Sequence, residues 1–147
     1  MKLEELRVYQ MSMQIGELVW DEVSNWSFFD KDTVGKQFVR SADSIAANIS
    51  EGYGRYHFKQ NKLFLYYARG SYKETCTWFR KAVNRGLISK DRDSDMDRLL
   101  DDFGPRLNNY IYSIGPSGGQ VNEDQAPYGS DPFDDFPLSQ ETPDPNP

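Results

Sequence analysis

Residues 34–53 read VGKQFVRSADSIAANISEGY, and the apolar side chains in this stretch recur every three or four positions. That spacing places them on one face of an α-helix. The apolar row consists of Val34, Phe38, Ala42, Ile45, Ile49 and Tyr53. The stretch therefore predicts an amphipathic helix that packs its apolar face against other elements.

Three further segments have the same period, at 6–23, 64–82 and 96–114, with polar breaks at 24–32, 52–58 and 86–91. In the first segment, the row predicted to face inward comprises Leu6, Tyr9, Met13, Gly16, Trp20 and Val23. Four amphipathic helices joined by short breaks predict an all-α fold, an antiparallel up-down four-helix bundle.

The chain has 147 residues, which is enough for one domain with its own core. Its C-terminal residues 116–147 contain seven acids, no base and many prolines. Such a composition buries too little apolar surface to offset the entropy of ordering. We therefore expect a four-helix bundle in residues 1–115 and a disordered, acidic, Pro/Asp-rich tail in residues 116–147.

Three features of the sequence bear on its location. No apolar run approaches the roughly 20 residues of a membrane span, and the N-terminal residues lack the apolar stretch of a signal peptide. A single cysteine, Cys76, cannot form an internal disulfide. These features predict a cytoplasmic protein with no membrane partner.

Charge is unevenly distributed along the chain. The net charge is −6, yet residues 33–90 hold eleven Lys and Arg against three Asp and Glu. On the third predicted helix, opposite its core row, six residues form a basic stripe: Lys59, Lys62, Tyr66, Arg69, Lys73 and Arg80. The stripe extends for about 31 Å at 1.5 Å per residue, so it can follow the phosphate backbone of RNA or DNA. The alternative is a solvated face whose bases pair with acids of the first and fourth helices.

The core row of the third predicted helix consists of Phe64, Ala68, Ser71, Thr75, Trp78 and Ala82. A second apolar row lies beside it: Leu65, Tyr72, Cys76, Phe79 and Val83. Together the two rows make a face broader than a helix needs inside one small bundle. The excess indicates contact with another subunit. A wide core within the chain is the alternative.

The second helix carries a polar row beside its core row: Arg40, Ser44, Asn48, Glu51 and Arg55. Neighbours three or four apart can satisfy one another as a network against a partner helix. Glu74, midway along the third helix, is positioned to join this network.

No arrangement typical of a catalytic or metal site is present. Carboxylate-bridged metal bundles use Glu-x-x-His pairs, and the only histidine, His57, has no carboxylate three residues before it. The acids of residues 91–102 lack the glycine and glutamate of a calcium loop, so they fit a helix N-terminus better, with Ser94 as N-cap. Pro105 predicts a kink or a break in the last helix. We expect no catalytic residues, no metal and no cofactor.

Four short stretches carry a resemblance to a known family. They are LRVYQ (6–10), RSA (40–42), SIAANISEGYGR (44–55) and ARGS (68–71), the last followed by Glu74. Over residues 3–113 the chain resembles the four-helix-bundle proteins encoded in intervening sequences of large-subunit ribosomal RNA genes. The resemblance implies a ring-forming homo-oligomer, typically a homopentamer. It assigns structural or interface roles, and no catalytic ones, to Arg40, Asn48, Glu51, Gly52, Arg69 and Glu74.

A related branch of that family serves as the accessory protein of reverse transcriptases in diversity-generating retroelements. The predicted function is therefore a non-catalytic, oligomeric scaffold that binds nucleic acid, a nucleic-acid enzyme such as a retroelement reverse transcriptase, or both. The alternative is a pure protein–protein adaptor that binds no nucleic acid.

The tail contains DPFDDFPL at residues 131–138, which places two Phe and a Leu among three acids. Such a segment suits docking to a basic, partly apolar groove. One hypothesis is that the tail folds back on the positive middle of the chain and competes with polyanions. The other is that it only keeps the protein in solution.

Overall fold

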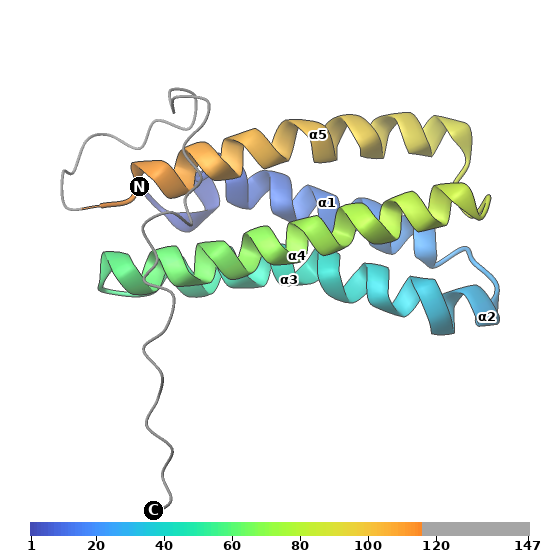
Figure 1. Cartoon of the computed structure of the whole chain (residues 1–147), viewed down its shortest axis with the longest axis horizontal. Helices are drawn as coiled ribbons and strands as arrows, with labels where there is room; N and C mark the ends of the chain where they lie inside the picture. The colour runs from blue at the N-terminus through green and yellow to red at the C-terminus, as the bar shows by residue number, and fades with distance from the viewer. Residues whose placement is uncertain (116–147) are drawn as a thin grey trace, which may run out of the picture.

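The computed structural model describes residues 1–115, in which four long helices form an antiparallel up-down bundle (Figure 1). The helices are α1 (Arg7–Val23), α3 (Lys36–Tyr53), α4 (Phe58–Asn84) and α5 (Lys90–Ser113). No strand occurs within these 115 residues, so the predicted fold class is confirmed. The predicted tail at 116–147 lies outside the described residues.

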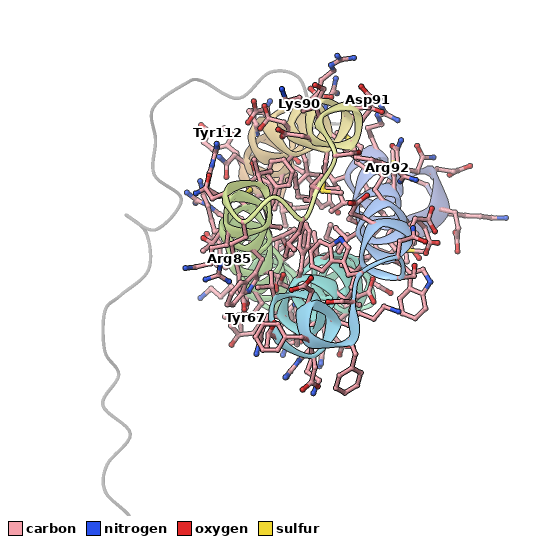
Figure 2. The ribbon with its side chains drawn as sticks, turned by 90° about the vertical axis from the view of Figure 1, so that its right-hand side faces the viewer. Tyr67, Arg85, Lys90, Asp91, Arg92 and Tyr112 are labelled. Carbon is pink, nitrogen blue, oxygen red and sulfur yellow. The ribbon has the colours of Figure 1, made fainter. Side chains whose placement is uncertain are left out.

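Each helix packs on two neighbours around one core, in the order α1, α3, α4, α5. The end-on view in Figure 2 shows the four helices enclosing their apolar side chains. Among the largest fully buried side chains are Ile15 of α1, Phe38 and Ile49 of α3, Leu65 of α4 and Phe103 of α5. None of the described helices is both long and apolar enough to cross a membrane.

Helical structure at the start of the second predicted helix begins earlier in the chain than expected. The three-residue α2 (Phe28–Asp30) and a π-helical turn (Lys31–Gly35) lead directly into α3, so helical structure starts inside the polar break expected at residues 24–32. Ser27 caps this start, because its hydroxyl accepts a hydrogen bond from the Asp30 N–H at 3.3 Å. The π turn brings Gly35 so close to α1 that a Cβ there would lie 2.8 Å from Val23 Cγ1.

The inward face of α1 differs from the predicted row. Met13 and Trp20 were expected in the core, but they are 45% and 58% exposed. The fully buried α1 row is instead Val8, Met11, Ile15 and Val19. The predicted row and the buried row both have helical spacing. The buried row, which is mostly aliphatic, packs against the neighbouring helices.

One expectation for α5 was wrong, the N-cap at Ser94. The helix begins at Lys90 after Ser89, so Ser94 lies inside it and donates its hydroxyl to the Lys90 carbonyl at 3.3 Å. Of the kink or break predicted at Pro105, the break is excluded, because helical structure continues through this residue. Proline has no N–H to donate to the Asp101 carbonyl, and both residues lie on the exposed side of the helix. Asp91 and Asp93 do lie in the first turn, as the acid run predicted.

Candidate nucleic-acid interface

The basic stripe lies on one uninterrupted helix, the 27-residue α4. Lys59, Lys73 and Arg80 are exposed, whereas Lys62, Tyr66 and Arg69 are half-buried. The middle of the stripe borders α5, where Arg69 and Lys73 line a small pocket of about 210 Å³ together with Gly104, Pro105 and Asn108. The stripe is therefore a rigid row along the α4–α5 side of the bundle.

Pairing with acids of neighbouring helices was the alternative explanation for the stripe. The ion pairs found among residues 1–115 join Lys36 to Asp32, Arg55 to Glu51, Arg92 to Glu22 and Arg106 to Asp102. Lys59, Lys62, Lys73 and Arg80 take part in no ion pair within that part of the chain. Four of the five bases are therefore not neutralised by a described acid.

Between the stripe and the core, Tyr72 fixes α4 against α5. Its hydroxyl donates a 2.8 Å hydrogen bond to the buried Leu100 carbonyl. The backbone of α5 comes so close that a Cβ at Gly104 would lie 2.6 Å from this hydroxyl. Burial raises the pKa of Tyr72, so its hydroxyl stays protonated and serves packing.

Cys76 has the surroundings of a structural thiol. Burial raises its pKa above the usual value, outweighing the neighbouring Tyr72 hydroxyl and the Lys73 charge, which both lower it. The thiol is therefore protonated at neutral pH and weakly nucleophilic. His57 precedes the opposite end of α4, roughly 28 Å away at 1.5 Å per residue. Within residues 1–115, no group of three His, Cys, Asp or Glu side chains is placed to hold a metal ion.

The turn between α3 and α4 adds aromatic side chains that the sequence reasoning missed. Tyr56 is 93% exposed and Phe58 is 51% exposed, immediately before Lys59 of the stripe. On the same turn the Arg55 guanidinium lies 4.7 Å from the centre of the Phe64 ring. The run YHFK at 56–59 was the available signal, because aromatics next to bases are typical of single-strand binding surfaces.

Gly52 lets this turn form. A Cβ at this position would lie 2.9 Å from Asn61 Oδ1 and 3.0 Å from the Asn61 carbonyl oxygen and Phe64 Cβ. The C-terminal end of α3 therefore touches the first turns of α4 through a position that only glycine fills without displacement. This close approach explains why the motif EGYG stands at the end of α3.

Neighbours in the polar row of α3 bond to one another, as predicted, but these bonds run along the row itself and do not include Glu74. The side chains of this row bond within their own helix: Ser44 Oγ donates to the Arg40 carbonyl at 2.7 Å and Asn48 Nδ2 to the Ser44 carbonyl at 2.9 Å. Arg55 pairs with Glu51 in the same way. Glu74 of α4 accepts a 3.1 Å hydrogen bond from Trp78 Nε1 and does not join the row.

The second apolar row of α4 is mostly core. Leu65, Tyr72 and Phe79 are buried within the chain, so the broad apolar face is largely explained by a wide internal core. Of the predicted core row, Ala68, Thr75 and Ala82 are buried, but Phe64, Ser71 and Trp78 are only half-buried. With the exposed Tyr67 these three form a strip on the side of α4 away from the basic stripe. Tyr67 is 50% exposed and its ring meets that of Phe64 edge to face, with the ring centres 5.6 Å apart.

Comparison with known proteins adds two findings. A family model described as the 23S rRNA-intervening sequence protein matches residues 4–109. The fold is also similar to a crystal structure of a protein with unknown function from the S23 ribosomal protein family of Bacteroides thetaiotaomicron. The TM-score is 0.64 at 19% identity, over 71% of this chain and 95% of that chain. No curated protein matches the chain.

Proposed function

This chain belongs to the family of 23S rRNA-intervening sequence proteins, and from that premise we propose that it is a non-catalytic scaffold that binds nucleic acid along α4. The name of the family associates such proteins with ribosomal RNA genes, which makes RNA the first ligand to test. A nucleic-acid enzyme such as a retroelement reverse transcriptase is the proposed protein partner. No part of the bundle described above offers an activated nucleophile.

One observation carries the proposal: Lys59, Lys62, Lys73 and Arg80 lie on one rigid helix without an acidic partner among the described residues. Bases that are not internally neutralised attract phosphates and release counterions when they bind. The exposed Tyr56 and Phe58 at one end of the row provide faces on which unpaired bases can stack. The combination favours a single-stranded ligand.

The binding face and the self-association face are separate in this proposal. The stripe borders α5, whereas the strip of Phe64, Tyr67, Ser71 and Trp78 lies on the opposite side of α4. We assign the strip to contacts between subunits of a ring, most simply a homopentamer. A ring assembled in this way would repeat the basic stripe around its circumference.

Salt dependence tests the nucleic-acid proposal. Replacing Lys59, Lys73 and Arg80 together with alanine should reduce the steepness of log affinity against log salt by about 2 for a single-stranded RNA. The matched control replaces three exposed bases on other elements, Arg7, Lys90 and Arg98, and should leave the slope nearly unchanged.

Two results would count against it. RNA binding whose salt slope is the same in both triple variants would place the phosphate contacts elsewhere. Absence of salt-dependent binding in the unaltered protein would favour the alternative function, a protein–protein adaptor.

A further inference from the structure

A second basic surface lies away from the stripe, in a pocket of about 400 Å³ between α1 and α3. Its size is within the range of ligand pockets, about 300–1,000 Å³. Its apolar wall is formed by Trp20, Val23 and Val39, and its basic rim by Lys31, Lys36 and Arg40.

The apolar wall has no cover among residues 1–115. Trp20 is 58% exposed although it is one of the largest apolar side chains in the protein. The pocket-lining Lys31 directly follows α2, in which Phe28 and Phe29 are 83% and 73% exposed. A group of exposed aromatics beside a pocket marks an interaction surface.

The rim is positive. Lys31 and Arg40 form no ion pair within the described part of the chain, and Lys36 Nζ lies 3.4 Å from Asp32 Oδ1. Both members of that pair are more than half exposed, so the pair is weak and can exchange for another carboxylate. The pocket therefore suits an acidic ligand with bulky apolar side chains.

We propose that this pocket binds residues 131–138 of the chain itself, DPFDDFPL. Phe133, Phe136 and Leu138 provide the apolar side chains for the wall, and three carboxylates match the three bases of the rim. The stripe on α4 matches this segment less well. The pocket beside it is half the size, about 210 Å³, and includes the polar side chains of Arg69, Lys73 and Asn108.

The length of chain permits this contact. The C-terminal end of α5 lies beside the N-terminal end of α1 (Figure 1), whereas Trp20 lies thirteen residues along α1, about 20 Å away. Fifteen residues lie between Gly115 and Asp131, and the sixteen Cα–Cα steps that join them can span at most about 53–58 Å. The segment therefore reaches the pocket of its own chain, and the tether raises its effective concentration there to the millimolar range.

Site-specific crosslinking in the full-length chain tests the proposal. A photoreactive p-benzoylphenylalanine in place of Phe136 should crosslink to the pocket segments, residues 20–24 and 31–40. The same probe in place of Tyr128, outside the segment, is the control and should show no preference for them. Crosslinks from position 136 to residues 59–80 of α4, or to no site in preference to others, would overturn the proposal.

Charge exchange provides a second test that does not perturb the core. Lys31→Glu combined with Lys36→Glu changes two exposed side chains and should lower the crosslink yield from position 136 at least several-fold. Adding Asp134→Lys and Asp135→Lys to this variant should restore the yield. A yield that the first pair of substitutions leaves unchanged would contradict the proposal. RNA binding by the stripe is measured separately, so either proposal can fail without the other.

Discussion

Gly52 shows at the scale of a single residue how the sequence shapes the surface proposed to bind RNA. Its missing side chain lets α3 approach α4 at Asn61 and Phe64. That contact positions the turn carrying Tyr56 and Phe58 beside Lys59. By contrast, Gly70 in the middle of α4 is exposed, and a Cβ there would meet no atom within 4 Å. The two glycines should therefore respond oppositely to substitution.

We expect Gly52→Ala to lower the free energy of unfolding by about 1–3 kcal/mol, because the added methyl group overpacks the α3–α4 contact. Gly70→Ala should raise it by about 0.5–1 kcal/mol, because alanine is the better helix former in an uncrowded position. Urea denaturation of both variants measures the difference. Equal effects of the two substitutions would show that α3 and α4 are not in close contact at Gly52.

At the scale of the elements, periodicity was sufficient to predict four helices and their antiparallel order. It could not decide which of two overlapping rows faces inward. In α1 the row with Val8, Met11 and Val19 is buried in place of the row with Trp20, and in α4 Leu65 and Phe79 are buried. The spacing of apolar residues shows which side chains share one face of a helix. Which of these faces is buried depends on where the neighbouring helices pack. The sequence therefore predicted the basic stripe but missed the exposed Trp20.

The first turns of α4 carry a separate prediction. Replacing Tyr56 and Phe58 with alanine should weaken single-stranded RNA binding by about 1–3 kcal/mol for each stacked base that is lost. The salt slope should stay the same, since neither ring is charged. Phe28→Ala with Phe29→Ala, two other exposed aromatic rings, at the other end of the bundle, is the control for fluorescence-anisotropy titrations. If the control pair weakens RNA binding as much as the Tyr56 and Phe58 substitutions do, the turn between α3 and α4 is not a stacking site for RNA bases.

Across the whole molecule, different surfaces are proposed to bind different partners. One side of α4 is basic and borders α5, the other carries aromatics, and the α1–α3 pocket combines an apolar wall with a basic rim. The negative net charge of the protein hides this arrangement, because seven of the acids lie in residues 116–147. Overall charge alone would have argued against a nucleic-acid ligand.

The ring proposal predicts different effects of two exposed tyrosines. Figure 2 shows Tyr67 on the outside of the bundle at the lower left, where α4 adjoins α3, and Tyr112 on α5 at the upper left. Tyr67→Glu should lower the molar mass of the particle from that of a ring toward that of a monomer, because it places a charge in the contact between subunits. Tyr112→Glu, at a similarly exposed site, should leave the mass unchanged. Light scattering coupled to size exclusion measures both variants, and a monomeric unaltered protein would contradict the ring.

Lysine footprinting tests the central claim, RNA binding along α4, most directly. The full-length protein is acetylated with and without a single-stranded RNA, and the rate at each lysine is read by mass spectrometry. We predict that RNA slows modification of Lys59, Lys62 and Lys73 and leaves Lys2 and Lys90 unchanged, because phosphates cover the stripe. RNA that binds while the three lysines on α4 react at their free rates would contradict the account.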